Sequence, residues 1–230
     1  MLYVTHTGCQ WRFLPAEFGP WTRVWSQFRR WSRNGTWAMV LAELHRHART
    51  EAGRVEELPS MIVIDWHLAR GGSRGGVTFH DRGGPYGRTN GAKRVVAVDV
   101  TGLPLAGVVV PASASENACV ERVLTELRRS AGQDERLELV LVDRGVSACA
   151  ARRLSKEFAL EVRRVGWDSP QFDEHGRRVF RPVAHAWRVE VAHGNLGWSR
   201  RLAKSFENTT ASATGWLQLA AVRAVLGRPT

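Results

Sequence analysis

The stretch Leu139-Val140-Leu141-Val142-Asp143-Arg144-Gly145 is the part of the chain from which the fold can be predicted. Its four apolar residues are typical of a short buried strand, and Asp143 follows at the end of that strand. The segment Met61-Ile62-Val63-Ile64-Asp65 repeats the pattern. Two buried strands that each bring an aspartate to one edge of a sheet predict a binding site for a divalent metal ion.

A third carboxylate is expected from a later helix, and Glu190 in Trp187-Arg188-Val189-Glu190 is the best placed. Cleavage of a phosphodiester needs a hard cation, and a pair of ions can activate the attacking oxygen and stabilise the leaving one. Asp65, Asp143 and Glu190 are therefore the candidate catalytic and metal-binding residues. The expected cofactor is Mg²⁺, with Mn²⁺ as a substitute and two ions bound. A single aspartate at a strand end is more often a turn or cap residue, so the prediction depends on all three.

The order of the elements predicts an α/β fold of the RNase H-like type, a mixed sheet flanked by helices. Strand, hairpin, helix, strand, helix, strand and helix follow one another, which gives three antiparallel strands extended by two parallel ones. Asp99 lies beside the hairpin turn and is expected to be a turn residue, not a metal ligand. The expected strands are 61–65, 94–100, 105–110, 139–143 and 160–165, and the expected helices are 115–130, 147–158, one from about 186, and 211–226.

Residues 1–57 are expected to form a small all-helical segment, and residues 58–230 the catalytic domain. Five apolar residues fall on one face of a helix that stops near Gly35, and this stripe is expected to pack on the core. Arg29 and Arg30 lie off the stripe and are candidates for contacts with DNA phosphates. The stripe consists of Trp21, Val24, Trp25, Phe28 and Trp31, and a second helix is expected from Trp37 to about Ala52.

The charge of the chain favours a nucleic-acid partner. It carries 33 Lys and Arg against 22 Asp and Glu, a formal net charge of +11. Such an excess suggests a polyanion, although an arginine-rich composition alone is the simpler alternative. Three distant cysteines argue for a reducing compartment and against a disulfide framework. Without a signal peptide or an apolar run of membrane length, a cytoplasmic protein is expected.

Two other kinds of hydrolase fit the sequence less well. His185, Glu190 and His193 are close together, but the His-Glu-x-x-His pattern of many zinc hydrolases is absent. A Ser-His-Asp hydrolase is weaker still, because there is no Gly-x-Ser-x-Gly motif. The glycine- and arginine-rich stretch 70–85 fits a phosphate-binding loop and a plain surface loop equally well.

Several short motifs are spread over nearly the whole chain. They are Thr7-Gly8-Cys9-Gln10-Trp11-Arg12-Phe13-Leu14-Pro15, Gly35-Thr36-Trp37, Ile64-Asp65, the hairpin 98–104, Val142-Asp143-Arg144-Gly145, Trp187-Arg188-Val189-Glu190 and the basic run 199–207. Taken together they resemble DDE transposases of bacterial insertion sequences, specifically the IS-five type group.

This resemblance implies that Asp65, Asp143 and Glu190 form the metal-binding catalytic triad. It also implies a reaction, in which hydrolysis at the ends of the element is followed by attack of the freed 3′-hydroxyl on target DNA. The expected partner is double-stranded DNA, both terminal inverted repeats and target, bound by a homodimer. No organic cofactor and no membrane contact are expected. The location would be the bacterial cytoplasm, on the nucleoid when DNA is bound.

The resemblance further implies that Arg200, Arg201 and Lys204 hold phosphates of the transferred strand. These residues are expected on a basic continuation of the glutamate helix, where Arg200 and Lys204 lie one turn apart on one face. The chain departs from many relatives at Val191, where they have arginine, and at Arg144, where they commonly have glycine. It also begins almost inside the first motif, so we expect a shortened N-terminal segment.

Two alternatives stay open at the level of the sequence. A catalytically inactive transposase remnant would still bind DNA, and an RNA-directed nuclease of the same fold would prefer an RNA strand. The terminal repeat sequence, the target-site preference, the oligomeric state and the route of excision do not follow from the sequence.

Overall fold

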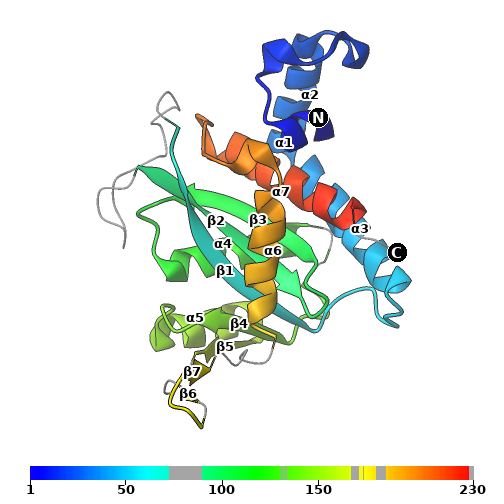
Figure 1. The fold of residues 1–230 in the computed structure, drawn as a ribbon. Helices are drawn as coiled ribbons and strands as arrows, with labels where there is room; N and C mark the ends of the chain where they lie inside the picture. Colours follow the sequence, from blue (N-terminus) through cyan, green and yellow to red (C-terminus); the bar gives the residue numbers. More distant parts are fainter. Residues whose placement is uncertain are drawn as a thin grey trace.

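A five-stranded mixed sheet forms the centre of the computed structural model (Figure 1). β1, β2 and β3 pair antiparallel, whereas β4 pairs with β1 and β5 pairs with β4 in parallel, in the order β3-β2-β1-β4-β5. The predicted RNase H-like arrangement is confirmed. The strands span Met61–Arg70 (β1), Gly91–Asp99 (β2), Pro104–Pro111 (β3), Leu139–Asp143 (β4) and Glu161–Val165 (β5).

Each face of the sheet has its own apolar core. Val63 of β1 and Leu141 of β4 belong to one core, while Ile62 and Val140 belong to the other. This alternation follows from the strand backbone, which points successive side chains to opposite sides. Odd-numbered residues of β1 and β4 therefore face one side of the sheet, which α6 covers, and we call it the α6 face.

Two helices cover the side opposite the α6 face. They are α4 (Glu116–Arg129) and α5 (Ala148–Phe158), and the predicted ranges for both are confirmed within one residue. Ser115 and Ser147 cap them, because each hydroxyl accepts a hydrogen bond from a backbone N–H three residues later, at 3.2 and 3.1 Å. Each of the two helices therefore begins at a serine cap.

On the α6 face, α6 (Trp187–Gly197) crosses in front of the strands, and α7 (Thr210–Leu226) packs on β3 and α3 (Figure 1). The N-terminal helices lie beyond α7. They are α1 (Leu2–Thr7), the short 3₁₀ helices η1 (Trp11–Phe13) and η2 (Ala16–Phe18), α2 (Trp21–Asn34) and α3 (Thr36–Glu51). Gly35 separates α2 from α3 with φ 80°, a left-handed conformation that favours glycine, as the predicted helix stop requires.

Aromatic rings join the N-terminal helices to the domain core. Phe28 of α2 stacks on Trp216 of α7 with ring centroids 4.1 Å apart, and Trp11 packs against both rings. Phe28 is 2% exposed, so this part of the predicted stripe is confirmed. The prediction is wrong for Trp25, which is 39% exposed, because the contact of α2 with the core is narrower than the stripe. Trp25 instead lies under the guanidinium of Arg29.

The β2–β3 turn is held by a buried carboxylate. Asp99 is fully buried, its Oδ1 accepts the backbone N–H of Thr101 at 2.8 Å, and its Oδ2 pairs with Arg49 of α3. His45 Nε2 lies 3.5 Å from the same oxygen. Burial alone would raise the pKa of Asp99, but the contacts with His45, Thr101 and Arg49 hold it well below its usual range. Asp99 is thus a turn residue, as predicted.

The chain after α6 does not continue as a helix. α6 ends at Gly197, and only a single 3₁₀ turn, η3 (Arg200–Leu202), follows it. Ser205 then forms a parallel bridge with Gly71, just beyond the end of β1. The sequence pattern suggested a longer helix because it cannot show that the chain turns back to pair with the sheet.

Arg94 on β2 holds this segment against the sheet. Its buried guanidinium donates hydrogen bonds to the backbone carbonyls of Leu202 and Lys204, the latter at 3.4 Å. Burial lowers the pKa of Arg94 to about 10. The prediction that Arg200 and Lys204 lie one turn apart on one helical face is therefore wrong, because the backbone between them is not an α-helix.

The structure describes residues 1–72, 90–130, 132, 134–166, 171–172, 174–179 and 185–227. Most of the glycine- and arginine-rich stretch 70–85 lies outside these residues, as does much of the segment 167–184. Within that segment, β6 (Gln171–Phe172) and β7 (Arg178–Val179) pair antiparallel. None of the helices in the described ranges is both long and apolar enough to cross a membrane.

Replacing Phe28 by alanine is expected to lower the free energy of unfolding by about 3–5 kcal/mol, because it removes a buried ring that stacks on Trp216. Trp25→Ala, on the same helix, should cost about 1 kcal/mol or less, since Trp25 lies at the surface. Urea unfolding followed by circular dichroism measures both. A Trp25 variant as unstable as the Phe28 variant would contradict this placement.

Candidate active site

Asp65 and Asp143 lie on the same face of two neighbouring parallel strands. Val63 of β1 is paired with Leu141 of β4, and each aspartate lies two residues further along its strand. Side chains two residues apart share a face, so both carboxylates belong to the α6 face. Asp65 is half-buried, whereas Asp143 is exposed, and its Oδ1 accepts the backbone N–H of Arg144 at 2.6 Å.

Glu190 lies on α6, the helix that covers this same face of the sheet. It lies in the first turn of α6, whose buried residues Val189, Ala192 and Leu196 pack into the core of the α6 face. α6 contacts β1 and β2, and the Glu190 side chain is exposed. The third candidate carboxylate therefore approaches from a helix packed over the strand that carries Asp65.

The pKa of Asp65 responds to the other carboxylates around it. It is raised to about 6, mainly by burial and further by the negative charges of Asp143, Glu190 and Glu116, although a backbone hydrogen bond from Trp66 opposes the rise. The structure thus brings the three predicted residues into one electrostatic neighbourhood. It adds Glu116 from the first turn of α4, which the sequence gave no reason to single out.

The donor set fits a hard divalent cation. Within the described part of the chain, Asp65, Asp143 and Glu190 form no ion pair, although the chain carries 33 Lys and Arg. Carboxylate oxygens are the ligands that Mg²⁺ prefers. In that same part of the chain, no three Asp, Glu, His or Cys side chains stand close enough to hold an ion as they are. To bind a cation, these carboxylates would have to move closer together, and the cation would offset their mutual repulsion.

Two histidines lie next to the carboxylates. His67 is two residues beyond Asp65 on β1, and its ring packs edge-on against His193 of α6 with centroids 5.1 Å apart. Burial lowers the pKa of both imidazoles to about 4, so both are neutral near pH 7. His185, the other member of the weighed zinc pattern, lies before the start of α6 and so does not share a helix with His193.

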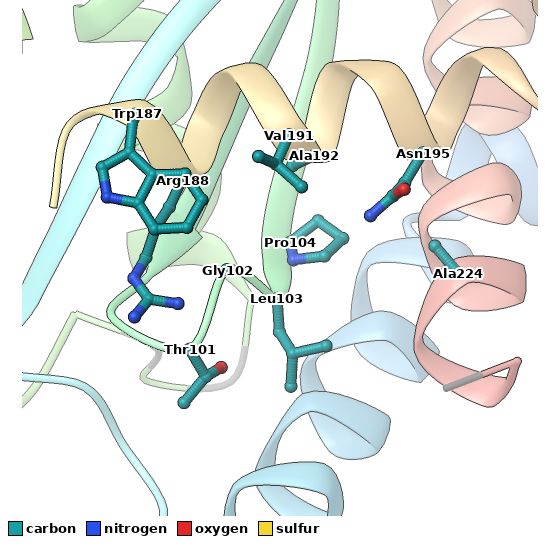
Figure 2. Close-up of a pocket in the computed structure, with 10 residues that line it drawn as sticks. All are labelled: Thr101, Gly102, Leu103, Pro104, Trp187, Arg188, Val191, Ala192, Asn195 and Ala224. Carbon is teal, nitrogen blue, oxygen red and sulfur yellow. The ribbon is translucent and has the colours of Figure 1, made fainter. Parts of the chain in front are cut away.

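A pocket of about 220 Å³ lies between α6 and the β2–β3 turn (Figure 2). Trp187, Arg188, Val191 and Asn195 of α6 line it opposite Thr101 to Pro104, and none of the candidate catalytic residues does. α6 therefore has one side over this pocket and another that carries Glu190.

The candidate DNA-binding residues differ in how free their charges are. Arg29 and Arg30 on α2, Arg200 in η3 and Lys204 are exposed. Arg201 is not, because its guanidinium pairs with Glu207 and lies over the Trp216 ring, 4.9 Å from the centroid. Contact of Arg201 with a phosphate would have to replace these interactions.

Two family models match the chain. Residues 1–41 match the family described as "Putative transposase of IS4/5 family", and residues 56–157 match "Transposase DDE domain". The second range runs from before β1 to the end of α5 and contains Asp65 and Asp143, and the two ranges together cover more than half of the chain. The fold and these matches define a DDE transposase domain. More narrowly, the chain belongs to the DDE transposases of the IS4/5 type.

Among solved structures, the chain is similar to a piggyBac transposase in a synaptic complex with hairpin DNA, determined by cryo-EM. The identity is 13% and the TM-score 0.34, over 73% of this chain and 46% of that one. The chain thus spans about half the length of that protein, and so distant a likeness carries no argument about the site. None of the curated proteins compared with this chain matches it.

Replacing Asp65 by asparagine is expected to stabilise the metal-free protein at about pH 8 by up to about 3 kcal/mol, since each pKa unit corresponds to about 1.4 kcal/mol. The folded state raises the pKa of Asp65, so this group's contribution is fully present below about pH 4 and is lost as the pH rises through 6. Thermal unfolding in EDTA should therefore show equal Tm values near pH 4 and a higher Tm for the variant at about pH 8.

Asp99→Asn is the matched control. The pKa of Asp99 is lowered in the folded state, so its contribution is present above about pH 4 and is lost in acid. This variant should be less stable than the wild type at about pH 8. A lower Tm for the Asp65 variant under the same conditions would contradict the crowding of negative charge around Asp65.

Proposed function

We propose that this chain catalyses metal-dependent cleavage of DNA at the ends of an insertion sequence and transfer of the cut strand to target DNA. The observation that supports this most is the gathering of Asp65, Asp143 and Glu190 on the α6 face of a DDE domain. These three residues would bind the metal ions and form the catalytic site.

The chemistry assigns a task to each side chain. Bound Mg²⁺, or Mn²⁺ in its place and two ions in all, would supply a Lewis acid for the phosphate and an activated oxygen nucleophile. Asp65 and Asp143 would hold the ions from the sheet, and Glu190 would hold them from α6. The half-buried Asp65 is costly to ionise without a cation nearby, so this side chain gains most from metal binding.

The proposed substrate is double-stranded DNA, with the terminal inverted repeats and the target as its two forms. The exposed Arg29, Arg30, Arg200 and Lys204 would contact phosphates, and the charge of +11 would draw the duplex in. Arg201 is the least suited of the predicted contacts. The protein would bind DNA as a homodimer. It would be located in the bacterial cytoplasm, and on the nucleoid when DNA is bound.

Asp143→Asn is expected to abolish Mg²⁺-dependent cleavage of duplex DNA that carries the terminal repeats, and to leave DNA affinity within about threefold of the wild type. The amide keeps the shape of the side chain but removes the charge that would hold a cation. Cleavage is measured on labelled duplex and binding by fluorescence anisotropy. Asp134→Asn, which removes a carboxylate paired with Arg128 away from the site, is the control and should cut normally.

The same experiment separates the alternatives. A variant that still cuts would show that the triad is wrongly assigned. A wild type that binds DNA but cuts under no metal condition would favour the inactive remnant, and preference for an RNA strand would favour an RNA-directed nuclease.

The double variant Arg29→Ala and Arg30→Ala is expected to weaken duplex binding similarly for all sequences. It should also reduce the slope of log Kd against log salt by about 1 per lost phosphate contact. The matched control is Arg152→Ala with Lys156→Ala, which removes the same charge from the exposed side of α5. If both double variants lose the same DNA affinity, Arg29 and Arg30 contribute only net charge and make no particular phosphate contacts.

A further inference from the structure

Glu116 lies against the turn that carries Asp143. A Cβ built on Gly145 would lie 1.5 Å from Glu116 Oε2 and 2.3 Å from its Cδ. The Glu116 carboxylate therefore occupies the space that a side chain at position 145 would fill. Gly145 has no left-handed backbone conformation, and the close approach there is made by the far end of the Glu116 side chain.

A second contact fixes the start of α4 on the same turn. Asn117 Oδ1 accepts the backbone N–H of Ser147 at 2.9 Å, and Asn117 Nδ2 lies 3.4 Å from the Ser147 hydroxyl. Both contacts come from the first turn of α4 and reach the few residues that follow β4. These hydrogen bonds fix the start of α4, which carries Glu116, against the turn that follows Asp143.

Among the residues that the structure describes, no cationic side chain pairs with Glu116. Within the described part of the chain it has no ion pair and no hydrogen bond, whereas Glu121 on the same helix pairs with Arg153 at 2.6 Å. The Arg144 side chain lies against Gly166.

A simpler explanation is that Glu116 only complements the dipole of α4. An acidic residue in the first turn of a helix is favourable for that reason alone. The dipole does not explain why the carboxylate fills the space beside Gly145. Nor does it explain why a fourth negative charge is kept near three others in a basic chain.

We infer that Glu116 is a fourth carboxylate of the metal-binding site, and that Gly145 leaves the space in which it acts. This rests on the proposed function, because it assumes that Asp65, Asp143 and Glu190 bind a divalent cation. Glu116 would add negative charge beside Asp143, as a ligand or through the water molecules of the ion. Groups that contact the ligands of a metal ion, and not the ion itself, commonly change metal affinity by about 10- to 100-fold.

The test measures Mn²⁺ binding to the DNA-free full chain by calorimetry and by the rise of Tm with added Mn²⁺. Glu116→Gln is expected to weaken binding by about 10-fold or more, with a metal-free Tm no lower than that of the wild type. Glu121→Gln, which removes a charge from the same helix, should bind Mn²⁺ as the wild type does.

Gly145→Ala provides an independent arm, because it displaces the Glu116 carboxylate without removing its charge. It should weaken Mn²⁺ binding in the wild type and have little further effect in the Glu116→Gln background. If Gly145→Ala does not fold, the isosteric Glu116→Gln still decides the question.

The outcomes separate this inference from the proposed function. If the wild type binds Mn²⁺, Asp143→Asn abolishes the binding and Glu116→Gln leaves it unchanged, the inference about Glu116 is overturned and the triad stands. If the wild type does not bind Mn²⁺, or if Asp143→Asn leaves its Mn²⁺ binding unchanged, the proposed function itself fails.

Discussion

The parallel pairing of β1 with β4 is the constraint on which the site depends. The pairing of Val63 with Leu141 puts Asp65 and Asp143 on one face of the sheet. A shift of one residue in β4 would turn Asp143 to the opposite face, toward α4 and α5, and would bury its apolar neighbours on the wrong side. The two apolar cores thus fix the register, and the register fixes the aspartates.

The distribution of charge separates structural carboxylates from those of the site. Asp99 is fully buried yet paired with Arg49, and Glu121 pairs with Arg153. Near Asp65 the protein does the opposite and brings acidic side chains together without a cationic partner among the described residues. A basic chain could easily supply an arginine there. Leaving the charge uncompensated costs stability, and under the proposed function a cation from solution would compensate it.

The sequence was sufficient for the sheet and for the two strand-end aspartates, because apolar runs with turn signals determine buried strands. It was not sufficient where contacts between distant segments determine the local structure. Glu116 looks like an ordinary first-turn residue until its contact with Gly145 is seen. The periodicity that placed Trp25 on a helical face could not give the width of the contact. The hydrogen bonds from Arg94 to the carbonyls of Leu202 and Lys204 hold a segment whose composition suggests a longer helix.

The stack of Phe28 on Trp216 joins α2 to α7, and α7 packs on the sheet that carries the aspartates. The basic side of α2 and the carboxylates are therefore joined through packed elements. A duplex gripped by α2 would meet the carboxylates at a set number of base pairs from the grip. In that case the aromatic stack sets the distance between the bound duplex and the carboxylates. Weakening the stack would make the position of cleavage less precise before it lowered the cleavage rate.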